Sequence, residues 1–391
     1  MKNWKILRWF VCMGQECKTV GIVGAGASGC ITAYFLSRAG IDVTLFDYSS
    51  PLRTLLPTGG GRCNLAHAEY DFRELAKNYP RGEKFLYSVF SNFSTYDTLA
   101  LFDELGIQTY TQNDGRIFPV SNSSKDVRNI ILSKLKNVKI KKEKVTEIQK
   151  IENGFKINTS NNSSYFFSHV VVASGGKNST EFIKHVKHTV ITHRPALVGL
   201  NTQENLPSGI VINNVFSKDL KISGDILLTH FGISGPLIYK ISSLKAFDAF
   251  PYKLGFDLYA ENLPLQELLN KNPHKELKNI LSKFLPSNFI KFLIPDLSDV
   301  CGYKIDGAAR DKILDKIHNF EVIVKGTNKG EETVTAGGID LNEIHSKSME
   351  SKLCPHLYFT GEVLNIDGFC GGFNLQNAWS TAYVAAQAIL N

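Results

Sequence analysis

Cysteine is scarce in this chain of 391 residues, and its seven copies follow no pattern that predicts a bridge or a metal site. They form no C-x-x-C pair and none of the spacings typical of zinc ligands. A small, odd set of thiols fits a reduced cytoplasmic compartment better than a secreted disulfide scaffold. The missing C-x-x-C also argues against a dithiol–disulfide reductase. We therefore expect a cytoplasmic protein that binds no metal.

Long apolar runs are also missing, because no stretch of about twenty apolar residues occurs, and we expect no membrane span. The first thirteen residues are basic and then apolar, like the opening of a signal peptide. However, Arg8 interrupts the apolar run and no small-residue cleavage site follows. We expect residues 1–17 to be an N-terminal extension, either unstructured or the product of an upstream start with Met13 as the true first residue.

The composition that is present is that of a globular protein with a basic balance. A hydrophobic content of 43% and a charged content of 21% are ordinary, and the length allows two or three domains. The formal net charge is +7, and much of it lies in the lysine-rich run 134–144. This run alternates with apolar residues, which favours the solvated face of a strand. A surface for nucleic acid or another anionic partner is the alternative.

The most informative segment is Thr19–Cys30, which predicts a buried strand, a glycine turn and the start of a helix. Gly24, Gly26 and Gly29 fill the G-x-G-x-x-G frame. The first glycine allows the tight turn, the second lets backbone approach a pyrophosphate, and the third lets the helix pack on the strand. The helix expected over 31–39 would direct its N-terminal N–H groups at the phosphates.

An acidic residue follows this motif at the distance that a dinucleotide site requires. The segment Val43–Asp47 predicts a second strand, and Asp47 lies about twenty residues beyond the glycines, where the adenosine ribose needs a carboxylate. A tight turn without a ligand is the alternative for the glycines alone. With strand, helix and acid all in place, we expect a bound dinucleotide.

Three further segments suggest where the rest of such a ligand lies. The loop Arg53–Asn64 holds three successive glycines, which suit backbone that passes close to a flat ligand. Val170–Gly176 predicts a buried strand that ends in two glycines. Leu357–Gln376 predicts a strand, a glycine loop and a last helix, whose N-terminus could donate to the pyrimidine edge of a flavin. Together these sites predict one split dinucleotide-binding domain.

The other segments fill in the fold class. Between the first glycine motifs we expect helices over 71–106 and 127–135, and a β-meander of four strands at 138–140, 145–148, 155–157 and 165–167. We predict an α/β fold in which a split Rossmann-like FAD-binding domain carries an inserted β-rich domain with a helical subdomain. The expected boundaries are 18–190 with 340–391 for the FAD domain, 191–259 with 319–339 for the β-rich domain, and 260–318 for the helical subdomain.

These motifs carry a resemblance to a known family. The chain resembles the bacterial YhiN-like flavoproteins, an aminoacetone-oxidase family that includes BaiN-like NAD(P)/FAD-dependent oxidoreductases, within the glutathione-reductase-like FAD superfamily. The matching segments cover nearly the whole chain beyond residue 18. They are Gly24–Gly29, Thr58–Asn64, Gly115–Pro119, Ala173–Gly176, Thr229–Pro236, Thr335–Gly338 and Gly361–Gln376.

The resemblance implies flavin-dependent redox chemistry. In such an enzyme the reduced flavin would deliver hydride to an activated C=C bond, and an acid would protonate the neighbouring carbon. The substrate would be a small molecule or a uridine of large-subunit ribosomal RNA, which would become dihydrouridine. The sequence has no second G-x-G-x-x-G after a strand, so NAD(P)H would visit only as a transient electron donor. A flavin-binding accessory protein without catalysis is the remaining alternative.

The chain departs from the family pattern at several positions. The loop after Gly176 is shortened. Leu52 stands in place of a usual glycine, His67 of an asparagine, Asn365 of an aspartate and Phe373 of a tyrosine. The last change removes a hydroxyl that could contact flavin or substrate.

The expected site combines backbone contacts with a few side chains. The predicted cofactor-binding residues are Gly24, Gly26, Ala27, Ser28, Gly29, Asp47, Gly60, Gly61, Arg62, Cys63, Asn64, Gly175, Gly361, Glu362, Gly371, Gly372, Phe373 and Asn374. The candidate proton donors are Cys370, Cys63 and His230. As alternatives, Arg62 would be a structural ion-pair partner, the two thiols small packing residues, and His230 a structural histidine.

Overall fold

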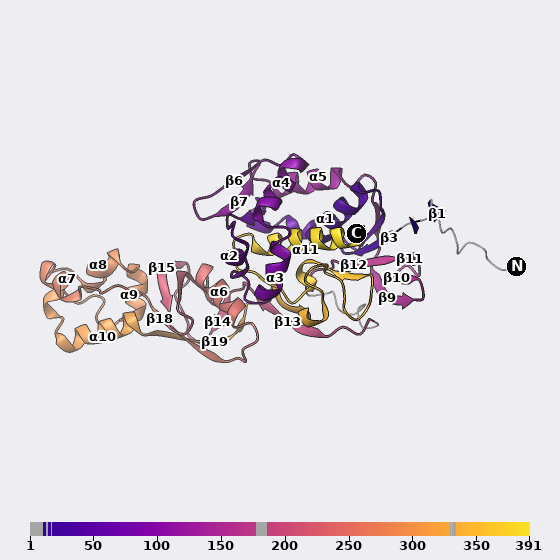
Figure 1. Cartoon of the computed structure of the whole chain (residues 1–391). Coiled ribbons are helices and arrows are strands. Elements are labelled where there is room, and N and C mark those ends of the chain that lie inside the picture. The colour runs from indigo at the N-terminus through magenta and orange to yellow at the C-terminus, as the bar shows by residue number, and fades with distance from the viewer. Residues whose placement is uncertain (1–10, 13–14, 17, 177–185, 329, 331–333) are drawn as a thin grey trace. The chain divides into compact units, whose positions relative to one another are not determined.

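The computed structural model describes residues 11–12, 15–16, 18–176, 186–328, 330 and 334–391. The chain divides into two compact units (Figure 1). The first unit joins Met1–His193 to Thr335–Asn391, and the second comprises Arg194–Val334. The chain passes from the first unit to the second within strand β13 (Val190–Ala196) and returns to the first within strand β20 (Val334–Ile339).

A five-stranded parallel sheet forms the centre of the first unit, in the order β21-β12-β3-β4-β8. Its strands are β3 (Thr19–Val23), β4 (Asp42–Asp47), β8 (Lys139–Lys142), β12 (His169–Val172) and β21 (Leu357–Phe359). β12 and β21 are buried along their whole length, as continuous apolar runs are in a parallel sheet covered on both faces. The α/β fold class with a parallel Rossmann-like sheet is confirmed.

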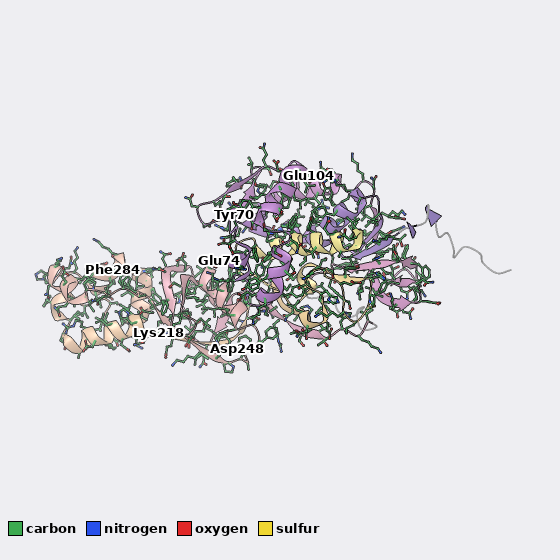
Figure 2. The ribbon with its side chains drawn as sticks, in the orientation of Figure 1. Tyr70, Glu74, Glu104, Lys218, Asp248 and Phe284 are labelled. Atoms are coloured by element: carbon green, nitrogen blue, oxygen red, sulfur yellow. The ribbon has the colours of Figure 1, made fainter. Side chains whose placement is uncertain are left out.

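The first unit has six α-helices in its described part, of which α1 packs on β3 and β4 and α11 on β21. They are α1 (Ala27–Arg38), α2 (Phe72–Ala76), α3 (Glu83–Phe90), α4 (Thr95–Leu105), α5 (Ser124–Ser133) and α11 (Phe373–Leu390). α1 packs along α11, and the indole of Trp379, which is fully buried, donates to the carbonyl of Leu65 at 2.9 Å. At the surface, Glu104 of α4 pairs with Arg38 in the last turn of α1 (Figure 2).

The expected four-stranded meander is wrong in one strand. β9 (Val145–Ile151), β10 (Gly154–Thr159) and β11 (Ser164–Phe167) do form an antiparallel sheet. The first expected strand instead becomes β8, which pairs in parallel with β4, Ile140 opposite Leu45. Local alternation could not separate these outcomes, because both leave one face of the strand solvated. The lysine-rich run thus lies on an edge strand, where lysines also discourage pairing with another chain.

Two smaller groups of strands complete the first unit. One sheet is formed by β5 (Ala66–His67), β7 (Arg116–Pro119) and β6 (Thr109–Thr111), and the other pairs β1 (Val11–Cys12) with β2 (Gln15–Glu16). The 3-10 helices of this unit are η1 (Arg53–Leu55), η2 (Thr58–Gly61), η6 (Leu341–Glu343) and η7 (Gly361–Val363).

The second unit is built on a closed barrel with the strand order β14-β17-β16-β15-β18-β19. The strands are β14 (Leu200–Thr202), β15 (Ile210–Ser217), β16 (Ile222–Thr229), β17 (Gly232–Ser234), β18 (Tyr252–Asp257) and β19 (Phe320–Thr327). β19 alternates buried and exposed residues from Phe320 to Lys325, so every second side chain enters the barrel core. Closure removes the sheet edges that a β-rich insert would otherwise expose.

Between β18 and β19 the chain turns helical, as expected from the sequence. The helices are α7 (Leu265–Lys271), α8 (Leu277–Ile280), η4 (Leu281–Lys283), α9 (Ser287–Leu293), η5 (Gly302–Lys304) and α10 (Gly307–His318), while α6 (Pro236–Leu244) follows β17. Their buried residues, such as Phe289 and Ile313, share one hydrophobic core with Phe256 and Val322 of the barrel. No helix in the described part of the chain is long and apolar enough to span a bilayer.

Candidate dinucleotide site

The glycine segments predicted to share a ligand lie together in the first unit. The hydroxyl of Ser28 donates to the carbonyl of Thr360 at 3.3 Å, across 332 residues of sequence. A Cβ at Gly361 would lie 2.6 Å from the Ser28 hydroxyl oxygen, so the start of α1 and the end of β21 are in direct contact. Since parallel strands bring their carboxyl ends to one edge of a sheet, a ligand at this edge meets both segments.

The three glycines of the first motif are needed for different structural reasons. Gly24 has φ +105°, and a Cβ there would lie 2.3 Å from the carbonyl oxygen of Ala173 at the end of β12. A Cβ at Gly29 would lie 1.9 Å from the carbonyl oxygen of Gly24. At Gly26 a Cβ would meet no protein atom within 4 Å. Packing therefore requires the outer glycines, whereas Gly26 faces open space.

The beginning of α1 fits the phosphates of a dinucleotide. Gly26 is the N-cap residue, and no side chain caps the helix there. The first backbone N–H groups of a helix have no partner within it, and they carry the positive end of the helix dipole. Because Gly26 adds no side chain in front of these donors, an anionic pyrophosphate can approach them closely.

Asp47 lies beside the glycine turn at the end of β4. One carboxylate oxygen accepts the Ala25 N–H at 2.8 Å, and the other accepts the N–H and the hydroxyl of Ser49 at 2.7 and 2.8 Å. These three donors hold the carboxylate next to the first motif. The position agrees with the predicted contact to a ribose, which stays a prediction.

The triple-glycine loop is a run of left-handed backbone. Gly59, Gly60 and Gly61 have φ of +58°, +68° and +84°, and a Cβ at Gly60 or Gly61 would meet no protein atom within 4 Å. The guanidinium of Arg62 lies 4.3 Å from the centre of the Phe118 ring, and its Nε donates to the Gly59 carbonyl at 3.2 Å. Arg62 forms no ion pair with an acidic residue in the described part of the chain. Its guanidinium is oriented by a cation–π contact instead.

The two predicted cysteines differ in environment. Cys63 has φ +66° and no exposed surface, and burial raises the pKa of its thiol to about 12. This thiol therefore stays protonated over the physiological range. Cys370 is exposed in the loop before α11. His230 lies in the second unit, in the turn between β16 and β17, where its side chain is exposed.

Asn64 joins the triple-glycine loop to the closing segment. With its amide oriented to satisfy both ends, it accepts the Gly372 N–H at 3.0 Å and donates to the carbonyls of Ala66 and Ile117 at 3.0 and 3.2 Å. A Cβ at Gly372 would lie 2.4 Å from the Ala66 carbonyl oxygen. Asn64 is buried and holds these two segments against each other.

Glu362 is fixed by a residue to which the sequence assigned no role. Its Oε1 accepts the Thr335 N–H at 2.8 Å and the Thr335 hydroxyl at 3.2 Å, and burial raises the pKa of this carboxyl. A Cβ at Gly176 would lie 1.8 Å from the Thr335 hydroxyl oxygen, so the second motif packs against the same pair. Gly175, with φ +78°, faces open space.

The loop before α11 is held by aromatic contacts. Phe373 is buried and its ring stacks on His67, with centres 4.7 Å apart and an interplanar angle of 29°. Nδ1 of His67 lies 3.1 Å from the Gly371 carbonyl oxygen, and the Tyr79 hydroxyl donates to the Phe373 carbonyl at 2.6 Å. Two positions that depart from the family pattern are thus in contact with each other.

A buried ion pair supports the same loop. Asp367 has no exposed surface and pairs with Arg81 through two hydrogen bonds. The Asn374 amide closes the loop on itself, donating to the Gly368 carbonyl at 2.7 Å and accepting the Gly368 N–H at 2.9 Å. No sequence pattern predicts these contacts of Arg81, Asp367 and Tyr79, because their partners lie almost 300 residues away and no short motif links them.

Residues 18–388 match the family described as HI0933-like protein Rossmann domain. The chain belongs to this family. The match covers both glycine-rich ends and the segment between them. The expectation of an FAD-binding oxidoreductase of Rossmann type is confirmed.

Two curated relatives agree with this assignment, and a solved structure shares the fold. The chain is 29% identical to a ribosomal RNA dihydrouridine synthase of Escherichia coli, covering 94% of this chain and 97% of the relative. It is 27% identical to a 3-dehydro-bile acid delta(4,6)-reductase of Clostridium scindens, with coverage of 94% and 98%. A flavocytochrome c3 fumarate reductase in its open conformation shares the fold at a TM-score of 0.50 and 14% identity, over 96% of this chain and 79% of that one.

Proposed function

We propose that NAD(P)H, as a transient electron donor, reduces FAD bound to this chain, and that the reduced FAD transfers a hydride to an electron-poor C=C bond, with a uridine of large-subunit ribosomal RNA as the substrate. The supporting observation is the contact of Ser28, in the first turn of α1, with Thr360 and Gly361 after β21, beside the open glycine position at Gly26. The names of the two relatives support the reaction class, because dihydrouridine formation and delta(4,6)-reduction both saturate a C=C bond.

Different residues of the first unit would bind successive parts of FAD. The N-terminus of α1, with Ala27 to Gly29, would bind the pyrophosphate, and Asp47 the adenosine ribose. Glu362, held by Thr335, would accept from the ribityl hydroxyls, while Gly60 and Gly61 leave room for the flat ring. The N-terminus of α11, behind Gly371 and Gly372, would donate to the pyrimidine edge. On this proposal residues 18–190 and 340–391 form the FAD domain.

Bound FAD supplies two-electron hydride chemistry. The protein must then provide a proton to the carbon next to the one that receives hydride, so that the C=C bond gains two hydrogens in total. Of the three candidate donors, Cys370 suits this task better than Cys63, because Cys63 has no exposed surface. His230 belongs to the second unit, where its ring packs against Phe231.

Absorbance spectroscopy tests the proposal first. The purified chain, incubated with FAD and desalted, should retain the visible bands of a bound flavin. Anaerobic NADH or NADPH should bleach these bands, and an unmodified fragment of large-subunit ribosomal RNA should restore them. Mass spectrometry of that fragment should then show a gain of two hydrogens in one uridine.

Each contrary result has a distinct meaning. Protein that stays colourless after FAD would overturn the flavin assignment. Bleached flavin that reoxidises with a small conjugated enone but not with RNA would favour a small-molecule reductase. Flavin that no nicotinamide bleaches, and that dithionite alone reduces, would overturn NAD(P)H as the donor.

A further inference from the structure

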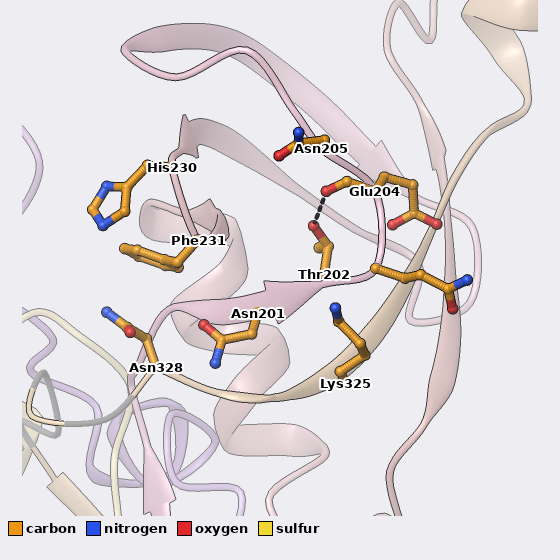
Figure 3. A pocket seen from close by; sticks show the side chains of 9 residues that line it. Asn201, Thr202, Glu204, Asn205, His230, Phe231, Lys325 and Asn328 are labelled. Carbon is orange, nitrogen blue, oxygen red and sulfur yellow. Dashed lines mark hydrogen bonds between the residues drawn. The ribbon is translucent and has the colours of Figure 1, made fainter.

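The second unit contains a pocket that the proposed flavin chemistry does not use. It has a volume of about 500 Å³, within the range of ligand sites. Its wall comes from β14 and the loop after it, from the turn between β16 and β17, and from the end of β19 (Figure 3). Ligand pockets for drug-like molecules are mostly apolar, whereas Phe231 is the only apolar side chain among the described residues that line this one.

Four carboxamides dominate the lining. They belong to Asn201, Gln203, Asn205 and Asn328. The backbone around them is pinned, since the Gln203 N–H donates to the Ile323 carbonyl and the Asn328 N–H to the Gly199 carbonyl, both at 2.8 Å. The Asn201 amide nitrogen donates to the Thr327 carbonyl at 3.2 Å, whereas its Oδ1 is buried without a hydrogen-bond partner among the described residues. Carboxamides offer a donor and an acceptor side by side, which is what the edge of a nucleobase requires.

The charges in the pocket leave one cation available. Both carboxylate oxygens of Glu204 accept the Ile323 N–H, at 3.0 and 3.1 Å, and the Glu204 carbonyl accepts the Thr202 hydroxyl at 3.0 Å (Figure 3). The acid is therefore tied to the barrel backbone. Lys325 is exposed and forms no ion pair with any residue that the structure describes. A lysine in this state suits a phosphate.

An aromatic surface completes the pocket. Phe231 is half-buried, and His230 packs edge-on against it with ring centres 5.3 Å apart and an interplanar angle of 84°. Figure 3 shows the Phe231 ring between His230 and Asn328. An aromatic face beside amides and a lysine is the combination with which proteins hold single-stranded RNA, through stacking, edge recognition and phosphate contact.

We infer that this pocket binds one unpaired nucleotide of an RNA, with its base on Phe231, its edge against the carboxamides of Asn201 and Asn328, and its phosphate at Lys325. The choice of RNA rests on the proposed function, and the binding site goes beyond it. The pocket gives the second unit a task of its own, which is to hold the RNA strand while the first unit holds the flavin. Its polar lining also makes it unsuited to an apolar steroid.

Fluorescence anisotropy with a short labelled oligouridine tests the inference on the full chain with oxidised FAD. Phe231→Leu should weaken binding by about tenfold, because a stacking face is lost. Lys325→Gln should weaken binding at low salt and reduce the salt slope by about one phosphate contact. Lys253→Gln is the matched control, since it removes the same charge from a lysine of the same barrel that pairs with Glu321 outside the pocket. It should leave the affinity and the salt slope unchanged.

Several results would overturn the inference. Equal losses in Lys325→Gln and Lys253→Gln would show that only net charge matters. Unchanged affinity in Phe231→Leu, in protein with normal flavin absorbance, would remove the stacking site. Uridine monophosphate that binds as tightly as the oligonucleotide would make a free nucleotide, not RNA, the ligand. Because binding is measured without turnover, these outcomes are independent of whether the flavin reduces a C=C bond.

Discussion

The candidate site of the first unit is formed mainly by backbone, whereas the pocket of the second unit is formed mainly by side chains. In the first unit the candidate FAD site is mostly backbone: glycines at 24, 26, 60, 61 and 361 that either pack without a Cβ or leave space for a ligand. In the second unit the pocket is made of side chains, with amides, a lysine and a phenyl ring mounted on a barrel. A backbone site tolerates almost no change of residue, whereas a side-chain site can lose one group and still fold. This difference predicts how each unit responds to mutation.

Gly24→Ala should give the largest effect. The new Cβ would lie 2.3 Å from the Ala173 carbonyl, and the backbone at φ +105° disfavours any side chain. We expect a loss of about 3 kcal/mol in the free energy of unfolding, together with the loss of FAD. Urea unfolding followed by circular dichroism measures the first and flavin absorbance the second. Gly40→Ala is the control, because it also has positive φ (+84°) but its Cβ would meet no atom within 4 Å; an equal loss there would contradict the clash.

Acid should weaken the first unit through His169, at the start of β12. Burial, helped by the nearby charge of His356, lowers the pKa of His169 from 6.5 to about 4. The unfolded chain therefore binds more protons than the folded one between these values, and stability is lost as the pH falls from about 6.5 to 4. His169→Gln should flatten this part of the curve of unfolding free energy against pH. An unchanged slope in the variant would assign the acid sensitivity to other groups.

Gly26→Ala should separate ligand binding from stability. A Cβ at this position meets no protein atom, so the apo protein should keep its unfolding free energy within about 0.5 kcal/mol. The methyl group would however stand in front of the helix donors, and we expect FAD affinity to fall by about tenfold or more, because close approach to these donors is lost. Titration of apoprotein with FAD, followed by flavin fluorescence, measures this. Wild-type affinity would place the pyrophosphate elsewhere.

Asn328→Ala should give the smallest effect on the fold. Its backbone N–H still donates to Gly199, and its amide has no protein partner among the described residues. We expect thermal unfolding and FAD content to match the wild type within about 0.5 kcal/mol. A clear loss of stability would show that the pocket, too, is part of the structural core, and would weaken the contrast between the units.

The same contrast explains how much the sequence could predict. Gly24 and Gly29 could be predicted from the sequence because tight packing at these two positions allows no larger residue. The motif therefore keeps a fixed spacing that can be recognised. The pocket could not be predicted in this way, because Asn201 lies in β14, Phe231 in the turn between β16 and β17, and Lys325 in β19, and barrel closure is what brings these segments together. The misplaced strand at Ile140 has the same cause: alternation predicts a strand but not its partner.

Polar contacts between residues far apart in the chain likewise could not be predicted from the sequence. Nothing near Arg81 indicates that it pairs with Asp367, or near Thr335 that it holds Glu362. These pairs form only after distant segments have packed. The predicted roles of the cofactor-binding residues remain predictions, but the structure does bring Ser28 into contact with Thr360 and Gly361 at one edge of the sheet.

The ion pair between Arg81 and Asp367 also has a consequence for biosynthesis. The second unit is continuous in sequence, so the ribosome synthesises all of it before it synthesises β21, Asp367 and α11. Domains generally fold as units while the chain is being synthesised. The barrel can therefore mature early, whereas the nucleotide unit must wait with α1 uncovered until the last helix emerges. A chain that ended after residue 334 would contain every strand of the barrel but would lack α11, which packs along α1 in the complete first unit.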